Sequence, residues 1–182
     1  KFYRRHLRGR PSIDLVIQRC DREMWRVFRA HHYLSGDLHR SARCFVGRVE
    51  GEPAVFGAVL HFPHPRDKRI KREHRTVCLP DYQGVGLGNA MSGAIASMCL
   101  GIGMRYLSTS SHPAMIRYRA QSSDWRMRSA PTWRGQSFAT GAKAKKGVVG
   151  GNKSQATRLR ASFEYVGAPM DAPTAERLWE GR

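Results

Sequence analysis

The segment 77–90, V-C-L-P-D-Y-Q-G-V-G-L-G-N-A, constrains the fold more than any other part of this sequence. An apolar run comes first, a Pro-Asp-Tyr turn follows, and alternating glycines lead into small and apolar residues at helical spacing. We therefore expect a strand, a turn, a glycine-rich loop and a helix, in that order. Glycines let successive backbone N–H groups point into one concavity at a helix N-terminus, where the helix dipole adds positive potential. The natural guest of such a loop is a phosphate or a pyrophosphate.

Two common phosphate-binding patterns do not fit this loop. A dinucleotide fingerprint, G-x-G-x-x-G, needs glycine where Asn89 stands, and no acidic residue follows at about twenty residues to bind a ribose. A Walker A loop needs G-x-x-x-x-G-K-S, whereas residues 147–154 read G-V-V-G-G-N-K-S, with asparagine in place of the second glycine. The pattern that does fit is Q-x-x-G-x-G, formed by Gln83, Gly86 and Gly88.

The rest of the chain alternates apolar runs of strand length with segments of helical spacing, which predicts one mixed α/β domain over residues 1–170. The expected strands are 13–17, 44–49, 54–62, 76–79, 106–109 and 159–166, and the expected helices are 21–32, 86–101 and 114–121. The second and third strands form a hairpin across a Glu-Gly-Glu-Pro turn. We expect a polar loop at 63–75, a flexible Gly- and Lys-rich loop at 135–155 and a C-terminal tail at 171–182.

Basic residues dominate the charge. Lys and Arg number 32 against 14 Asp and Glu, which gives a formal net charge of +18, and 25 of the basic residues are Arg. Such an excess favours polyanionic partners, and arginine suits bidentate contact with phosphate and stacking on bases. The sequence contains no run of roughly 18 apolar residues, which is the length that a membrane-spanning helix needs. We expect nucleic acid as partner, DNA favoured over RNA, and no membrane. The residues expected to contact it, where basic side chains interleave with tryptophan or fill the flexible loop, are Arg117, Arg119, Trp125, Arg126, Arg128, Arg134, Lys143, Lys145 and Lys146.

The cysteines predict the compartment. They are Cys20, Cys44, Cys78 and Cys99, and no C-x-x-C pair occurs among them. This spacing is typical of reduced core thiols in a cytoplasmic protein and excludes a zinc ribbon. No secretory signal is visible, and a start at Lys1 rather than Met indicates a fragment whose targeting segment could lie outside it.

The Q-x-x-G-x-G loop after an apolar strand resembles the pyrophosphate-binding signature of the GNAT acyltransferases, which bind acyl-CoA. The order of the expected elements around this loop resembles the whole GNAT fold. That resemblance implies a mixed, mostly antiparallel central sheet flanked by helices, in which the signature strand splays from its neighbour. Four further motifs resemble a branch of phage DNA-modifying acyltransferases of the Mom type and acetyltransferase domains fused to transporter-like ATPases. They are H-H-Y-L at 31–34, S-S-H-P at 110–113, W-R-M-R at 125–128 and A-S-F-E-Y-V-G at 161–167.

By this resemblance the cofactor is acetyl-CoA or another acyl-CoA. The backbone of the signature strand would receive the pantetheine arm as if it were another strand, and the amides of the glycine loop would hold the pyrophosphate. The residues implied to bind the cofactor are Val77, Cys78, Leu79, Gln83, Gly84, Val85, Gly86, Leu87, Gly88 and Asn89.

Acyl transfer to an amine needs a neutral amine, N–H support for the oxyanion and a proton donor for the departing thiolate. Tyr118 lies near the place where many GNAT enzymes have a tyrosine that protonates the CoA sulfur, and a core or surface role is equally open. His112 could relay a proton from the amine or cap a helix. Ser111 could bind the amine or belong to an ordinary turn. His32 ends the first helix, which borders the acceptor site in GNAT proteins.

Two other polar groups have simpler interpretations. Glu73 or His74 could act as a base through a water molecule, but solvated charges in a basic loop are the favoured interpretation. A metal site built from His61, His64 and Asp67 would need a chance convergence of loops, so we expect no metal.

Three functions are open at this point. The first is an acyl-CoA-dependent N-acyltransferase that acts on nucleic acid, most concretely a phage-type DNA base-modification enzyme, with an RNA- or tRNA-directed enzyme as a close variant. The second has a protein or small-molecule amine as acceptor, and electrostatics oppose it because a cationic enzyme repels cationic acceptors. The third is a GNAT-like nucleic-acid-binding module without catalysis, which would not need an intact cofactor loop. The sequence leaves a monomer and a homodimer equally open.

Overall fold

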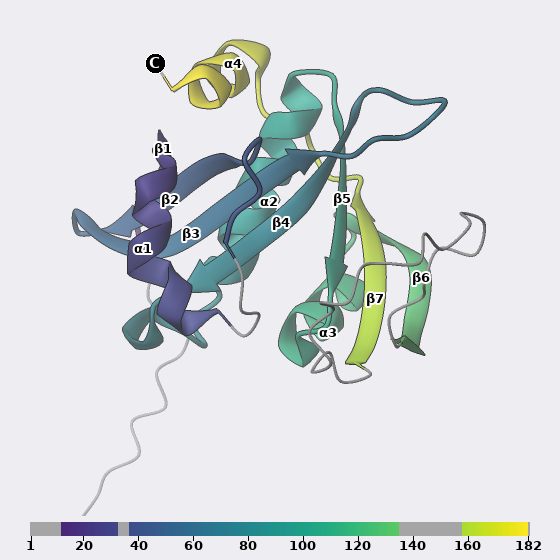
Figure 1. The fold of residues 1–182 in the computed structure, drawn as a ribbon, viewed down its shortest axis with the longest axis horizontal. Coiled ribbons are helices and arrows are strands. Elements are labelled where there is room, and N and C mark those ends of the chain that lie inside the picture. Colours follow the sequence, from purple (N-terminus) through teal and green to yellow (C-terminus); the bar gives the residue numbers. More distant parts are fainter. Residues whose placement is uncertain (1–11, 33–36, 135–157, 182) are drawn as a thin grey trace, which may run out of the picture.

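A seven-stranded sheet in the order β1-β2-β3-β4-β5-β7-β6 forms the centre of the protein. The structure is a computed structural model that describes residues 12–32, 37–134 and 158–181. Neighbouring strands are antiparallel except β4 and β5, which run parallel (Figure 1). The strands are β1 (Val16–Cys20), β2 (Arg43–Val49), β3 (Glu52–His61), β4 (Ile70–Cys78), β5 (Arg105–Ser110), β6 (Trp125–Arg134) and β7 (Arg158–Tyr165). The α-helices are α1 (Trp25–Phe28), α2 (Leu87–Gly101), α3 (Pro113–Gln121) and α4 (Ala172–Glu180), and the 3-10 turns are η1 (Arg22–Met24), η2 (Arg29–His31) and η3 (Pro80–Tyr82). The predicted mixed, mostly antiparallel sheet is confirmed.

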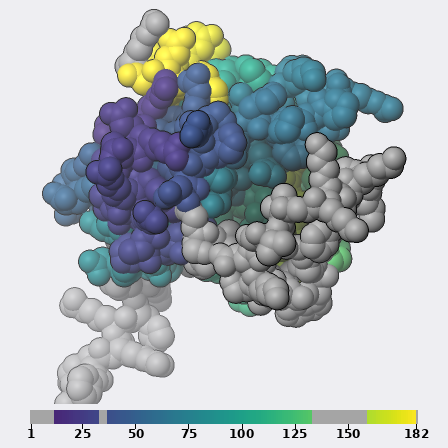
Figure 2. All heavy atoms as spheres, in the orientation of Figure 1, coloured from purple at the N-terminus to yellow at the C-terminus, as the bar shows by residue number. Residues whose placement is uncertain are grey.

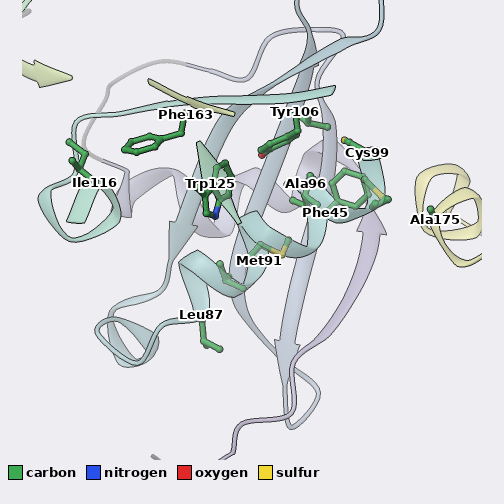
Figure 3. Close-up of a cluster of buried hydrophobic side chains, with 14 of the residues drawn as sticks. Phe45, Leu87, Met91, Ala96, Cys99, Tyr106, Ile116, Trp125, Phe163 and Ala175 are labelled. Atoms are coloured by element: carbon green, nitrogen blue, oxygen red, sulfur yellow. The ribbon is translucent and has the colours of Figure 1, made fainter. Parts of the chain in front are cut away.

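Apolar side chains are buried on both faces of this sheet. On one face, α2 packs Met91 and Ile95 into a cluster with Tyr106 and Phe163 (Figure 3). Helix α2 approaches β3 closely because Gly57 has no side chain, and a Cβ there would lie 2.5 Å from Cδ1 of Ile95. Burial of this kind contributes about 25 cal/mol for each Å² of apolar surface removed from water.

The opposite face carries a smaller core beneath α1. The rings of Trp25 and Phe28 pack on Phe56 of β3, with centroids 5.4 and 5.5 Å apart. Figure 1 draws α1 in front of the sheet and α2 behind it, and Figure 2 shows the purple N-terminal segment on the near surface. The sheet is therefore the middle one of three layers.

The structure confirms the hairpin, the helix expected at 86–101 and the strand expected at 159–166. It corrects several other expectations, among them the first strand, which lies at Val16–Cys20 and not at 13–17. The loop expected at 63–75 ends early, because β4 already begins at Ile70. Strand β6 was not expected, because its arginines were assigned to a surface segment. The residues expected as a C-terminal tail form α4, whose first turn is capped by Asp171 and which packs on α2 through Ala175. The helix expected at 21–32 is only a short α-helix flanked by 3-10 turns.

None of the helices in the described ranges is long and apolar enough to cross a membrane.

Candidate functional site

Strands β4 and β5 are paired only at their beginning. Residues 70–72 of β4 pair with residues 105–107 of β5, and beyond this point the two strands diverge (Figure 1). Strand β4 stays paired with β3 as far as Cys78, and β5 stays paired with β7 as far as Ser110. The gap between them continues into a cleft of about 890 Å³, lined by β4, the start of α2, the end of β5 and α3. The splayed signature strand is therefore confirmed.

A buried ion pair lies where the strands separate. Glu73 and Ser108 follow the last paired residues in register, yet they meet through side chains, since the Ser108 hydroxyl donates to the Glu73 carboxylate. Arg119 of α3 donates to both carboxylate oxygens, at 3.1 and 3.3 Å, and Thr76 Oγ1 donates at 2.7 Å. The Arg119 side chain is completely buried, with its guanidinium carbon 4.3 Å from the ring centroid of Trp125. The polar cluster thus takes over where the backbone ladder stops.

This arrangement fixes the charge of Glu73. Burial raises its pKa, but the charge of Arg119 and the hydrogen bonds from Ser108, Thr76 and Arg119 outweigh burial and lower the pKa to about 2. The expectation of a solvated charge in a loop was wrong, because Glu73 lies in β4 and both its oxygens are engaged. A carboxylate held in this way is not available as a general base.

The glycine loop lies at the other wall of the cleft, where α2 begins. Gly84 and Gly86 have φ angles of 81° and 99°, a region that glycine adopts without strain. No side chain caps α2, and within the described residues no acceptor takes the N–H groups of Gly84, Val85 and Gly86. The side chain of Gln83 donates to the carbonyl oxygen of Cys78 at 3.1 Å and so ties the loop to the end of β4. The result is a set of unpaired N–H groups beside the cleft, at the positive end of a helix.

These residues fit the acyl-CoA that the sequence motif implies. A Cβ added at Gly84 or Gly86 would meet nothing within 4 Å, so the space in front of the loop is open. The side-chain oxygen of Asn89 is buried without a partner in the described structure, and Asn89 lines the cleft. Beyond residue 72, the edge of β4 that faces β5 has no ladder partner in the described sheet, so its amides can pair with those of an extended pantetheine arm. Loop and strand edge together suit a pyrophosphate joined to a chain of amides.

Most of the residues implied to bind cofactor line the cleft. The two that do not are Leu79 and Val85. The N–H of Leu79 already donates to the carbonyl oxygen of Ala54, at 3.0 Å, so it is not available to a pantetheine amide. The thiol of Cys78 is protonated at neutral pH, since burial raises its pKa to about 11.

All four side chains expected to act in catalysis line the same cleft: Tyr118, His112, Ser111 and His32. Tyr118 on α3 is 46% exposed, so it is not a core residue. His112 occupies the N-cap position of α3, but its side chain makes no capping hydrogen bond. The ring of His32 packs edge-on against Trp25, with centroids 5.8 Å apart. The cleft therefore brings the catalytic candidates and the glycine loop together.

The residues expected to contact nucleic acid are divided by the structure. Arg119 and Trp125 are wrong, because both are buried in the core, where Arg119 pairs with Glu73 and Trp125 packs against aromatic rings. Arg117, Arg126 and Arg128 are exposed. The side chain of Arg134 and the three lysines Lys143, Lys145 and Lys146 lie outside the described part of the chain.

Sequence reasoning missed three arginines of the cleft, namely Arg72, Arg75 and Arg160, and it favoured a solvated loop position for His74, which also lines the cleft. His74 is the extra residue of a bulge in β4, since Glu73 pairs with Val59 and Arg75 with Ala58. Burial and the charges of neighbouring arginines lower the pKa of His74 to about 4, so the ring is neutral at pH 7, and its Nε2 accepts from the backbone N–H of His39. The sequence signal for these residues was the charged run K-R-E-H-R at 71–75, which is predicted as part of a polar loop.

The arginines give the cleft a positive charge. Arg72, Arg75 and Arg160 are among its lining residues, whereas the single acidic residue among them is Glu73, which Arg119 already neutralises. Anionic guests are therefore favoured over cationic ones.

Solved structures that resemble this chain include several acetyltransferases. An acetyltransferase of the GNAT family from Streptococcus pneumoniae matches with a TM-score of 0.55 and 12% identity over 83% of this chain and 98% of that one. A Bacillus subtilis acetyltransferase in complex with CoA matches with 0.56 and 11%, over 85% and 98%. The ribosomal-protein-S18-alanine N-acetyltransferase from Escherichia coli matches with 0.53 and 13%, over 87% and 95%. No family model and no curated protein matches this chain. The chain thus has the fold of the GNAT acetyltransferases, as predicted.

Proposed function

We propose that this protein is an acyl-CoA-dependent N-acyltransferase, with acetyl-CoA as donor, that modifies nucleic acid, most concretely a DNA base in the manner of phage Mom-type enzymes. The observation that carries the donor is the uncapped glycine loop beside the unpaired edge of β4. Acyl-CoA, when bound, supplies an acyl group activated as a thioester. The loop amides bind the pyrophosphate, and the edge of β4 orients the pantetheine arm.

The proton transfers fall to side chains on the other wall of the cleft. Tyr118 donates a proton to the departing thiolate, and its exposure at the wall of the cleft supports this role. His112 accepts the proton that the acceptor amine loses, and Ser111 orients that amine by a hydrogen bond. Backbone N–H groups on the unpaired edge of β4 are the donors available to the carbonyl oxygen of the thioester.

The charge of the cleft supports a nucleic-acid acceptor. Arg72, Arg75 and Arg160 line it, and the chain as a whole carries a net charge of +18. His74 is neutral at pH 7, so the positive charge of the cleft comes from the arginines. Such a site attracts phosphates and repels lysine side chains and polyamines. A positive field also favours the neutral form of an amine, which is the nucleophilic form.

Replacing Gly86 tests the donor half of this proposal. Because φ at Gly86 is 99°, a valine there strains the loop and projects a side chain into the open space before it, so we expect Gly86→Val to weaken acetyl-CoA binding at least tenfold by calorimetry. Gly103→Val is the matched control, since φ at Gly103 is 74° and no atom lies within 4 Å of a Cβ there either. Equal loss of acetyl-CoA binding in both variants, or unchanged binding in Gly86→Val, would contradict the assignment of the loop.

The acceptor half is tested with isotopically labelled acetyl-CoA and a choice of DNA, RNA and protein acceptors in one reaction. We expect label in DNA. Label in RNA or protein alone, with acetyl-CoA binding intact, would contradict the choice of acceptor and leave the donor half standing.

A further inference from the structure

Three arginines cover one buried carboxylate on a face of the sheet. The side chain of Glu164 in β7 is only 6% exposed, and it forms salt bridges with Arg105 at 2.7 Å, Arg126 at 2.8 Å and Arg128 at 3.1 Å. Arg126 lies opposite Glu164 in the ladder between β6 and β7, Arg128 follows within the adjoining bulge, and Arg105 comes from β5. We refer to these three arginines and Glu164 as the arginine cluster.

The cluster holds more positive charge than the fold needs to neutralise Glu164. Arg105 also binds Asp67 at 2.9 Å, and Asp67 pairs with Arg69, so four arginines face two carboxylates in all. The side chains of Arg126 and Arg128 are 60% and 51% exposed. In the described structure, Nε and Nη1 of Arg126 and Nε and Nη2 of Arg128 have no protein partner. Glu164 thus fixes two guanidinium groups while leaving most of their donors free.

This surface continues into the cleft. Successive side chains of a strand alternate between faces, so Arg160, Ser162 and Glu164 of β7 share one face while Phe163 points into the core. Arg160 lines the cleft, and four residues along β7 place it about 13 Å from Glu164. Between them, Ser162 Oγ lies 3.0 Å from Thr109 Oγ1, which also belongs to the cleft. A polar stripe therefore leads from the arginine cluster to the proposed site of reaction.

We infer that the arginine cluster is a phosphate-binding site for the backbone of DNA, which docks there while a neighbouring base reaches the cleft along the stripe. Guanidinium groups pre-oriented by a carboxylate lose little entropy on binding and match the paired oxygens of a phosphate. Contacts of this kind position a duplex and carry no sequence information. The identity of the ligand as DNA rests on the proposed function, whereas the existence of an anion site rests on the cluster alone.

Removing the two exposed arginines tests the inference. We expect the double variant Arg126→Gln, Arg128→Gln to bind a short fluorescent DNA duplex at least tenfold more weakly by anisotropy, and to reduce the slope of log K against log salt by about 2. The matched control is Arg26→Gln, Arg177→Gln, which removes the same charge from exposed arginines on α1 and α4. The control is expected to keep the wild-type slope. Thermal unfolding of both variants checks that each is folded.

The outcomes separate this inference from the proposed function. Equal loss of DNA affinity and slope in both double variants would mean that only net charge matters, and would overturn the arginine cluster as a site. A loss of RNA binding through the same two arginines, without DNA binding by the wild type, would overturn DNA as the occupant. Acetyl-CoA binding does not depend on these arginines, so its failure in the wild type would instead contradict the proposed function.

Discussion

Tyr118 is the tyrosine that faces the cleft from α3, and its surroundings differ from those of the other tyrosines nearby. Its side chain is 46% exposed, so its hydroxyl can meet a ligand. Tyr106 of β5 is fully buried, and burial raises its pKa well above the ordinary value. It therefore cannot exchange a proton with a substrate. Tyr82 also lines the cleft, but from the turn before the glycine loop. Of the three, Tyr118 lies on the wall opposite the loop.

Removing the hydroxyl of Tyr118 is the residue-scale test of catalysis. If it donates the proton to the departing thiolate, Tyr118→Phe should lower kcat by about 100-fold while leaving the affinity for acetyl-CoA unchanged. Tyr82→Phe is the control, since it removes a hydroxyl from the same cleft, and it should keep most of the wild-type kcat. Comparable rates in Tyr118→Phe and the wild type would exclude this role.

The fates of individual arginines could not be predicted from their positions in the sequence. Arg119 and Arg126 belong to one basic, aromatic-rich segment, yet Arg119 is completely buried and Arg126 is 60% exposed. The partner that draws Arg119 inward is Glu73, 46 residues away. Local spacing reveals neither that partner nor Glu164, which holds Arg126. In contrast, the conformation of the glycine loop could be predicted, because the local sequence with its alternating glycines determines it.

At the scale of elements, the cleft depends on how β4 leaves β5. The strands could be predicted from their apolar ends, but the point of separation could not, because it is occupied by a polar side-chain cluster from β4, β5 and α3. Strand β4 was also expected to be shorter, since its first half carries charged residues that pair with other elements. Helix α4 was missed because the sequence segment is short and shows few apolar residues.

Breaking the ion pair should destabilise this junction. Arg119→Met leaves the Glu73 carboxylate buried without its cation, so we expect it to lower the free energy of unfolding by about 3–5 kcal/mol, measured by urea denaturation at pH 7. The control Arg117→Met changes an exposed arginine of the same helix, and a change within about 0.5 kcal/mol is expected. Similar losses in the two variants would contradict the role assigned to the pair.

The ion pair also predicts a pH dependence. The folded-state pKa of Glu73 is about 2 against an ordinary 4.5, so its contribution is fully present above about 4.5 and is lost as the pH falls toward 2. Glu73→Gln should therefore flatten stability against pH within that window. Parallel curves for Glu73→Gln and the wild type between pH 4.5 and 2 would contradict the low pKa.

At the scale of the whole molecule, the basic residues behind the net charge of +18 have different roles. Some are buried inside the fold, as Arg119 is. Others stabilise the end of α4, where Arg19 and Arg43 donate to the carbonyl oxygen of Trp179 at 3.1 and 2.8 Å. The remainder includes the cleft arginines and the arginine cluster, which the stripe on β7 connects. Composition predicted a polyanionic partner, and three-dimensional structure is needed to say where one could bind.

Acyl transfer from acyl-CoA to a nucleic-acid base is the reaction proposed for this cleft. The most direct test is mass spectrometry of nucleosides digested from DNA after incubation with the protein and acetyl-CoA, using ordinary DNA and hypermodified phage DNA. At an acetyl-CoA concentration below the wild-type Kd, we expect a new acylated nucleoside with the wild type and with Gly103→Val, and at least tenfold less of it with Gly86→Val. No mass change in either DNA, from a protein that binds acetyl-CoA, would contradict it.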